Sequence, residues 1–476
     1  MNSRTFIAHL VQSLYSLVSK APLDVSNRQQ RTTSIRLMDL LFAIGHINWA
    51  LADQAVLSGS NFLSGILLVR ILGLEGYGGY TLALSFVLFV QSLQHQAINT
   101  AMMSIGPKQD AASASSYFGA VFSLQLLFAI ASTILTLIML VIVDSSMPAW
   151  GLHSAIVPIS LAVLFCQTQE FFRRYFFCVG RHAIGFLLDS VRYLGQLIAL
   201  SALPVIENGT PTFALALWMT VIPAALTIPV AIRLLPRLIW FGHNTLDVAV
   251  KKWHFTKWLL ASGLLSWTMT NLFFVASGVF LGAASTGALK AAFNIVGITN
   301  ILFLGLENVV PAEASRRLMD RGKRALNAYI IRVTLFGTML TGVIVFVFGI
   351  YPEFWLGLFY GGDFKPYASL VRWWCVINLF IFLGLPIRAW LRSVEDTRAI
   401  FLAYVLSALV SIIVAYPLIA IFGAAGALMG VLTSNISNLG VLLFLIFKKR
   451  NAFQEKTDIF PPAMAISPGS DRNLPY

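Results

Sequence analysis

The sequence predicts an all-α polytopic membrane protein of about 12 transmembrane helices, in two pseudo-symmetric six-helix lobes around a central cavity. Hydrophobic residues make up 58% of the chain and charged residues 11%, whereas soluble domains carry about 25% charge. Lys and Arg crowd every second connection between the apolar stretches and are nearly missing from the others. This alternation is the positive-inside pattern, which predicts cytoplasmic N- and C-termini and an even number of spans.

Each predicted span is an apolar stretch long enough to cross a hydrocarbon core about 30 Å thick as a helix. The first six form an N-lobe over residues 47–234, and the last six form a C-lobe over residues 256–447. Their limits are 47–72, 79–105, 116–143, 150–177, 183–205, 212–234, 256–281, 287–312, 328–350, 367–391, 398–421 and 425–447.

Three segments outside the lobes are predicted to be cytoplasmic. Residues 1–46 contain a short apolar stretch, Thr5 to Val18, which is typical of an amphipathic helix on the membrane surface. Residues 235–255 are the inter-lobe linker. Residues 448–476 are polar and rich in proline, and predict a disordered tail.

An internal repeat supports the division into lobes. Residues 72–83 align without gaps with residues 281–292, so that Leu72-Gly73 matches Leu281-Gly282. Each copy joins the first two spans of its lobe. The lobes are therefore predicted to run in parallel, related by an axis along the membrane normal.

Four cations break the charge pattern: Arg70 at the end of span 1, Lys290 in span 8, Arg372 in span 10 and Lys365 just before it. One interpretation is that they snorkel to the outer interface. The other is that they line a hydrated cavity, because ionised groups within membrane segments usually face water or protein. Lys290 favours the second, because Asn294 follows one turn later on the same face. A cationic cavity suits a phosphate or diphosphate.

Span 5 carries Asp189 and Arg192 three residues apart, and Glu170 and Arg173 repeat the arrangement in span 4. Such pairs can be purely structural. Alternatively, Arg192 receives a substrate headgroup and Asp189 holds it in place. Span 2 has a polar stripe that serves either hydrogen bonding between helices or recognition of sugar hydroxyls. Its members are Gln91, Gln94, His95 and Asn99.

Asp53 and Glu307 are, with Asp189, the candidates for ion coupling. Asp53 lies within the first turns of span 1 and either reaches cytoplasmic water or, if buried, binds a cation or proton. Glu307 lies near the cytoplasmic end of span 8. No metal site is predicted, because His95 has no Glu or Cys partner at ligand spacing. The only cofactor-like requirement is an H+ or Na+ gradient.

The formal net charge of +13 is spread over many short loops, which favours contact with anionic membrane lipids over binding of nucleic acid. The sequence has no Gly-rich ATP-binding loop ending in Gly-Lys-Ser/Thr, and no His-Glu-x-x-His motif or nucleophile elbow. These observations predict that the protein is not an enzyme and has no catalytic residues.

Where span 1 meets span 2, Arg70-Ile71-Leu72-Gly73-Leu74-Glu75-Gly76-Tyr77-Gly78 resembles the corresponding motif of bacterial polysaccharide flippases. These belong to the multidrug/oligosaccharidyl-lipid/polysaccharide (MOP) exporter superfamily. The second copy keeps the glycines but lacks an equivalent arginine, so cation binding there rests on Lys290. The basic connection with Arg173, Arg174 and Arg181 is also similar to the family's inner loop, and the resemblance extends from about Ala50 to Arg450.

The resemblance implies an alternating-access carrier in the bacterial inner membrane. It would flip an undecaprenyl-diphosphate-linked oligosaccharide from the cytoplasmic to the periplasmic leaflet, for O-antigen, capsule or exopolysaccharide synthesis. Other polysaccharide assembly proteins are candidate partners. The predicted substrate-binding residues are Arg70, Arg192, Lys290, Arg372, Asn294, Gln91 and His95.

Three alternatives remain open at the level of sequence. A multidrug or cation exporter of the same superfamily would need an acid-rich cavity. A membrane-bound polysaccharide polymerase or ligase would need an essential group in an outward loop, where Glu353 and Asp363 lie. A scaffold subunit of a glycan assembly complex would need neither.

Overall fold

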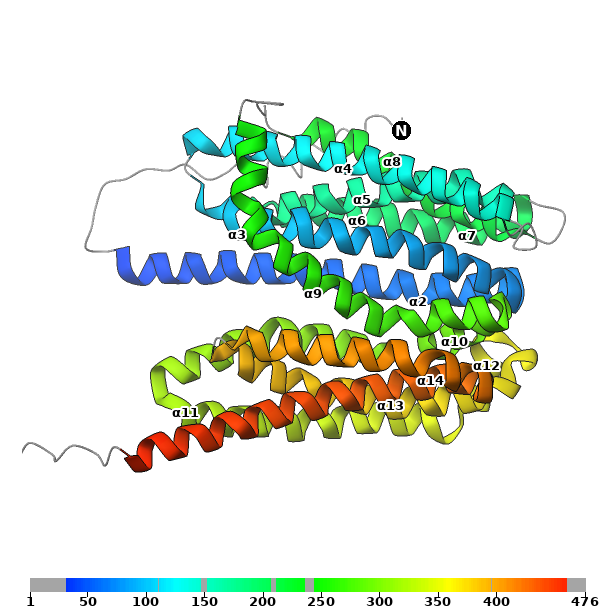
Figure 1. Cartoon of the computed structure of the whole chain (residues 1–476). Helices are drawn as coiled ribbons and strands as arrows, with labels where there is room; N and C mark the ends of the chain where they lie inside the picture. Colours follow the sequence, from blue (N-terminus) through cyan, green and yellow to red (C-terminus); the bar gives the residue numbers. More distant parts are fainter. Residues whose placement is uncertain are drawn as a thin grey trace, which may run out of the picture. The chain divides into compact units, whose positions relative to one another are not determined.

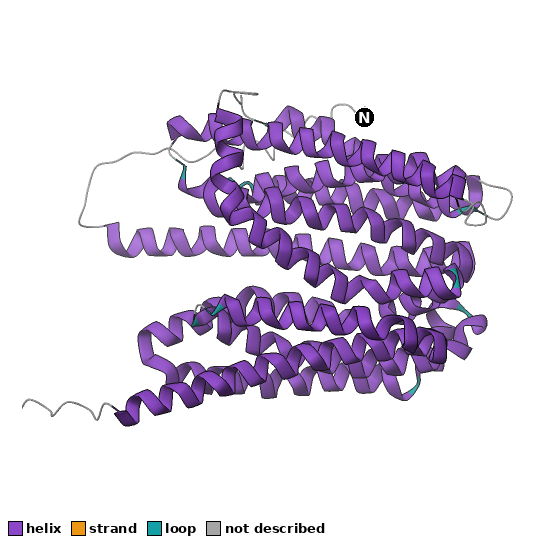
Figure 2. Ribbon diagram, viewed as in Figure 1, coloured by secondary structure: helices purple, strands orange, loops and turns teal. Residues whose placement is uncertain are grey.

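The computed structural model describes residues 31–109, 111–146, 152–206, 211–235, 244–394 and 396–459. Every regular element within these ranges is a helix (Figure 2), which confirms the all-α fold class. The predicted surface helix at Thr5 to Val18 and the end of the predicted tail lie outside the described residues. By its contacts the chain divides into two compact units, Met1–Leu51 and Ala52–Tyr476, and every site below belongs to the second.

The helices of the first half cover all six predicted spans of the N-lobe (Figure 1). Two π-helical turns, η1 and η5, interrupt the second and fifth spans. The elements are α2 (Arg31–Gln94), η1 (His95–Asn99), α3 (Thr100–Ile105), η2 (Gly106–Lys108), α4 (Ala111–Ser146), η4 (His153–Ala155), α5 (Ile156–Cys178), α6 (His182–Asp189), η5 (Ser190–Leu194), α7 (Gly195–Ile206) and α8 (Phe213–Leu234).

The second half covers the remaining six predicted spans. Helix also extends into two segments outside the predicted spans: the start of α9 lies in the linker 235–255, and the end of α14 lies in the tail 448–476, which was predicted to be disordered. The elements are α9 (Asn244–Leu281), α10 (Ala283–Val296), α11 (Ile298–Ile350), α12 (Pro352–Tyr360), η6 (Gly362–Tyr367), α13 (Ala368–Ser393) and α14 (Thr397–Ile459).

The number of spans follows from where the long helices break. In the described residues, eight helices are long and apolar enough to cross a membrane, or ten if two bent pairs are each counted as one span. Two of the eight, Ala52–Met103 and Arg398–Phe447, are divided into two long pieces by a non-helical glycine, Gly73 or Gly423, whereas Gly322 divides only a short piece from Glu313–Ile350. In Figure 1 the chain turns back at both places. Dividing these two helices at their glycines brings the ten to the twelve spans predicted, and the chain is a multi-pass membrane protein.

The internal repeat is visible in the backbone. Gly73 (φ 67°, ψ −172°) and Gly282 (φ 90°, ψ 168°) occupy matching positions in the two copies and adopt the same conformation. A positive φ combined with an extended ψ is accessible essentially to glycine alone. The glycine therefore lets the chain leave the first span of each lobe and start the second without a longer loop.

The outer faces of several helices are apolar and exposed. Only 17% of the most apolar part of α4 is buried within the protein, and Leu135 on α4 is 68% exposed. Ile413 on α14 is 71% exposed. Apolar surface of this extent is stable where lipid tails cover it. These exposed apolar faces of α4 and α14 are therefore the ones that contact the lipid hydrocarbon.

The α5 helix is the best-buried span in the described residues, with 67% of its membrane window inside the protein. One side packs Phe171, Phe172 and Phe176 into an aromatic cluster with Phe122 of α4. Another side carries polar groups at helical spacing, including Gln169 and Arg173. Packing on the aromatic side therefore fixes the positions of the polar groups on the other side of α5.

Candidate functional site

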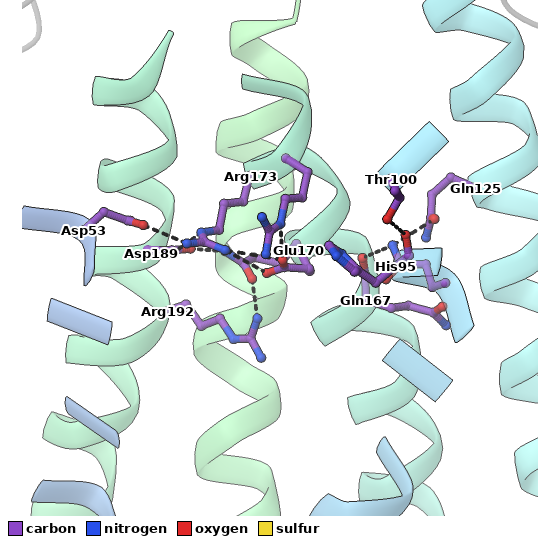
Figure 3. A network of polar contacts seen from close by, with 12 residues as sticks. Asp53, His95, Thr100, Gln125, Gln167, Glu170, Arg173, Asp189 and Arg192 are labelled. Atoms are coloured by element: carbon purple, nitrogen blue, oxygen red, sulfur yellow. Dashed lines mark hydrogen bonds and ion pairs between the residues drawn. The ribbon is translucent and has the colours of Figure 1, made fainter. Parts of the chain in front are cut away.

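A buried ionic network joins α2, α5 and α6 of the N-lobe (Figure 3). Its hub is Arg173 of α5, which is 7% exposed. The guanidinium Nη2 donates to Asp53 Oδ2 of α2 at 2.8 Å, and Nε is 2.6 Å from Asp189 Oδ2 of α6. Nη1 is 3.3 Å from Glu170 Oε1, one turn earlier on α5. One guanidinium therefore joins carboxylates from three helices.

A second guanidinium completes the pairing of Glu170. Arg174 Nε donates to Glu170 Oε1 at 2.7 Å, and the Arg174 side chain is half-buried. With Arg192 counted, the network contains three arginines and three acids, Asp53, Glu170 and Asp189, so that their formal charges cancel. Buried charges are tolerated when they are paired and hydrogen-bonded in this way.

Asp189 and Arg192 do not pair directly, although their spacing in the sequence predicts it. Gln169 joins them: its Nε2 donates to Asp189 Oδ1 at 2.7 Å, and its Oε1 accepts from Arg192 Nη1. The π-helical turn η5 begins immediately after Asp189 and contains Arg192. A π-turn holds more residues per turn than the α-helix on which the pairing prediction rested, so the two side chains point in different directions and reach different partners.

Arg192 is 7% exposed and lies over the ring of Tyr193, with 4.8 Å between the guanidinium carbon and the ring centroid. Its Nε is buried and has no hydrogen-bond partner within the described chain. This places Arg192 inside the protein, as expected for a functional cation. It is part of the ionic network of the N-lobe.

A cluster of amide side chains adjoins the ionic network. Gln94 Nε2 donates to Gln125 Oε1 at 2.9 Å and to the backbone oxygen of Gln167, and Gln167 Nε2 donates to Ser132. His95, in the π-turn η1, lies between Glu170 and these amides in Figure 3. Several buried polar atoms in this region lack a partner among the described residues: Gln94 Oε1, Gln125 Nε2, Gln167 Oε1, and both side-chain atoms of Asn99.

Lys290 lies on α10, in the second half of the chain. The side chain is half-buried, and its ammonium lies 4.5 Å from the ring centroid of Phe293 and 5.6 Å from that of Phe274. Trp374 of α13 packs on both rings. No carboxylate in the described residues pairs with the ammonium, so its positive charge is balanced only by the aromatic faces.

The face of α10 that carries Lys290 meets the first two spans of the N-lobe. Asn294, one turn after Lys290, donates to the hydroxyl of Tyr77 at 2.7 Å. Gly287, one turn before, lies against the backbone of Leu74. Because residues 287, 290 and 294 share one helix face, Lys290 lies at the boundary between the two lobes.

Gln91 is half-buried on α2 and makes no hydrogen bond with the rest of the described chain.

Arg70 has a structural partner. Its Nε and Nη2 donate to the backbone oxygens of Phe359 and Leu358, at 2.5 and 2.8 Å. These are the last carbonyls of α12, which have no partner within the helix. A cation there also complements the negative end of the helix dipole. Arg70 therefore ties the end of span 1 to a short helix of the other lobe.

Two further predicted residues form ion pairs at the surface. Arg372 Nη2 is 2.8 Å from Glu353 Oε1, and both side chains are about half exposed. Glu307 Oε1 is 3.6 Å from Arg392 Nη2, again with both side chains exposed. The structure does not join either pair to the ionic network or to Lys290.

Arg173 is the residue that sequence reasoning placed differently, among the basic residues of a cytoplasmic connection. Two signals were present: Arg173 lies inside the predicted span 150–177, and Glu170 precedes it at helical spacing. The contacts with Asp53 and Asp189 join distant segments, so the sequence alone could not show them.

Among the described residues, no three His, Cys, Asp or Glu side chains are grouped so that they could hold a metal ion.

Comparison with known proteins agrees with this architecture. Residues 259–417 match the MatE family model. The chain is similar to the solved structure of a multidrug resistance MATE family transporter of the MOP superfamily in an inward-facing conformation. The TM-score is 0.69, with 14% identity over 85% of this chain and 96% of that one. The chain has the MOP-superfamily fold.

Two further structures share the MOP fold. The lipid II flippase MurJ, in an inward closed conformation, gives a TM-score of 0.64 with 16% identity over 86% of this chain and 87% of that one. An outward-facing MATE transporter of the MOP superfamily gives 0.54 with 15% identity over 87% and 96% of the two chains. No curated protein matches this sequence.

Proposed function

We propose that this MOP-fold protein flips an undecaprenyl-diphosphate-linked oligosaccharide from the cytoplasmic to the periplasmic leaflet of a bacterial inner membrane. Both termini would then be cytoplasmic, and transport would proceed by alternating access of a cavity between the lobes. The observation that carries the proposal is Lys290, an ammonium without an acidic partner in the described residues, at the boundary between the lobes.

An ammonium in this position is suited to an anionic headgroup. Burying a cation within a membrane segment is costly, and such residues usually mark a substrate or ion pathway. A diphosphate would provide the charge that Lys290 lacks, through charge-assisted hydrogen bonds. The half-buried ring of Phe293 beside the ammonium offers an apolar face to the C–H surface of a sugar.

A second candidate function is export of cationic drugs, which the MatE match of residues 259–417 favours. A cationic substrate requires uncompensated acidic groups. Asp53 and Asp189 both pair with Arg173, and Glu170 pairs with Arg173 and Arg174. The described acids of the lobe interior are thus already neutralised, which supports the anionic substrate.

Asp53 and Asp189 are the proposed ion-coupling residues, because both are buried in membrane segments and belong to one network. Glu307 is a weaker candidate for this role, since it is exposed and pairs with Arg392. Arg192 is proposed to act within the network, whereas Arg70 contributes by holding α12.

The test is surface glycan production in a strain that lacks the chromosomal gene. Wild type and Lys365→Ala should restore the glycan, because Lys365 is an exposed cation of the same half. Lys290→Ala should reduce glycan output at least tenfold at a normal protein level, and the lipid-linked precursor should accumulate. Normal glycan output from Lys290→Ala would contradict the proposal. Restored drug resistance without any effect on glycan would favour the exporter.

A further inference from the structure

The middle of α9 carries three half-buried polar side chains, Trp267, Thr268 and Asn271, well inside the predicted span 256–281. Thr268 Oγ1 donates to the backbone oxygen of Leu264 at 2.9 Å, and Asn271 Nδ2 donates to the backbone oxygen of Trp267 at 3.2 Å. In membrane helices Thr and Asn commonly hydrogen-bond across to another helix. Within the described chain these two bond only to α9 itself, so attachment to a neighbouring helix does not explain them.

Two groups of this turn have hydrogen-bonding capacity that the described chain does not use. Trp267 Nε1 is buried and has no partner there, although a buried indole N–H usually finds an acceptor. The only hydrogen bond of the Asn271 amide is the one from Nδ2, which leaves Oδ1 as a free acceptor. A donor and an acceptor one helical turn apart match a hydroxyl group, which both accepts and donates.

Span 2 of the N-lobe covers this part of α9. Phe89 of α2 packs edge-on against Trp267, with 4.7 Å between the ring centroids. A Cβ on Gly263, one turn before Trp267, would collide with the Gln96 side chain of η1. The Gln96 amide is half-buried and makes no hydrogen bond with the rest of the described chain. An aromatic ring, an unused indole donor and two amides therefore meet at the boundary between the lobes.

The polar stripe predicted on span 2 does not supply these groups. Gln94 and Asn99 are fully buried, and Gln94 donates to Gln125 of α4 and to the backbone of α5 inside the N-lobe. Gln96 was not among the predicted residues, yet it is the amide that lies against α9.

This part of α9 leads directly to Lys290. Phe274 follows Asn271 by three residues, which puts the two on one side of the helix. The ring centroid of Phe274 is 5.6 Å from the Lys290 ammonium. Trp267 lies seven residues before Phe274, or about 10 Å along the helix. The first sugar of a lipid-linked oligosaccharide is bonded to the diphosphate, so a diphosphate on Lys290 would direct that sugar toward Asn271 and Trp267.

We propose that Trp267 and Asn271 of α9, with Gln96 of η1, form a saccharide subsite that binds the sugar next to the diphosphate. The inference rests on the proposed function and deepens it: Lys290 recognises the charge, and the saccharide subsite recognises the sugar. Its ligand is a sugar with an apolar C–H face for the Trp267 ring and a hydroxyl that accepts from Nε1 and donates to Asn271 Oδ1. Nε1 becomes accessible when the lobes move and Phe89 separates from Trp267.

The test is equilibrium binding of two lipids to the purified full chain in detergent, both labelled on the polyprenyl chain. One is an undecaprenyl-diphosphate-linked oligosaccharide, and the other is undecaprenyl diphosphate without sugar. Wild type should bind the first at least tenfold more tightly, because only that lipid satisfies the polar groups of the subsite. Trp267→Phe keeps a ring and removes the N–H, and Asn271→Leu removes the amide. Each should reduce the preference at least threefold and leave binding of the sugar-free lipid unchanged.

Trp390→Phe and Asn435→Leu are the matched controls. Trp390 Nε1 already donates to Asn327 Oδ1, and Asn435 Nδ2 donates to the backbone one turn earlier in α14, as Asn271 does in α9. Both controls should keep the wild-type preference. A general loss of stability weakens binding of both lipids and leaves the ratio of their affinities unchanged, so the ratio reports recognition of the sugar.

Equal affinity of wild type for the two lipids would overturn the inference. So would a wild-type preference in both Trp267→Phe and Asn271→Leu. In either case Lys290→Ala should still weaken binding of both lipids, and the proposed function would stand. Binding of neither lipid by wild type would instead contradict the proposed function, and the inference with it.

Discussion

Gly78 of the first repeat copy and Gly287 of the second copy each lie against the backbone of the other copy, where the two lobes meet. A Cβ on Gly287 would lie 3.1 Å from the backbone nitrogen of Gly78 and would collide with the carbonyl oxygen of Leu74. A Cβ on Gly78 would collide with the carbonyl oxygen of Ala283. Leu74 and Ala283 match each other in the repeat, as do Gly78 and Gly287. The two contacts are therefore related by the internal symmetry, and the repeat itself forms a close backbone approach between the lobes.

Replacing Gly287 should hold the lobes apart at this end. Gly287→Ala would place a methyl group against backbone, which cannot move aside as a side chain can, at a cost of about 1–3 kcal/mol. Such a cost shifts a two-state equilibrium by about 5- to 150-fold. We expect glycan export to fall about tenfold with normal membrane insertion. Gly305→Ala is the control, because a Cβ there meets nothing within 4 Å. Full export by Gly287→Ala would show that this approach is not needed.

Removing the charge of Arg173 should destabilise the N-lobe strongly. Arg173→Met leaves Asp53 and Asp189 buried without their cation, and breaking a buried pair in this way costs about 3–5 kcal/mol. Thermal unfolding in detergent should show a lower midpoint for Arg173→Met than for Arg174→Met. Arg174 is half-buried and pairs only with Glu170, so its removal leaves fewer buried charges without a partner. Adding Asp53→Asn to Arg173→Met should recover part of the loss, since one unpaired charge is removed. Equal midpoints for the two arginine variants would contradict the role of Arg173 as the hub.

Arg70 should act on α12 and not on the substrate. In Arg70→Ala the last carbonyls of α12 lose their donors, and amide hydrogen exchange in residues 352–360 should become severalfold faster. Arg332→Ala, which removes an exposed arginine from α11, should leave that exchange unchanged. If Arg70→Ala leaves exchange in α12 unchanged but weakens substrate binding, then Arg70 is a headgroup ligand.

Much of the fold could be predicted from the sequence, because membrane spans are set by local composition. Length, hydropathy and the alternation of basic residues predict the twelve spans, and the repeat at Gly73 and Gly282 predicts two related lobes. These signals are local, and every backbone group within a bilayer must be satisfied inside its own helix. The extra helix at the end of α14 was not predicted, because residues 451–459 were grouped with the proline-rich tail, although they contain neither proline nor glycine and include the helix formers Ala452, Gln454 and Glu455.

The candidate site was predictable only in part. Asp53, Asp189 and Arg192 attract attention as charges within apolar segments, and all three are buried in one network. Their partners could not be predicted, because the π-turn η5 changes which way Arg192 points and because Arg173 contacts residues far away in sequence. Arg372 looked similar in the sequence, yet it pairs with Glu353 at the surface. Spacing along a helix predicts a shared face but not which other helix covers that face.

The most direct test of the account is flipping of a fluorescent undecaprenyl-diphosphate-linked oligosaccharide by the purified protein in proteoliposomes. Wild type and Lys365→Ala should flip it at similar rates, and Lys290→Ala should flip it at least tenfold more slowly while unfolding at the same temperature. Flipping by Lys290→Ala at the wild-type rate would contradict the claim that the unpaired ammonium at the lobe boundary binds the headgroup.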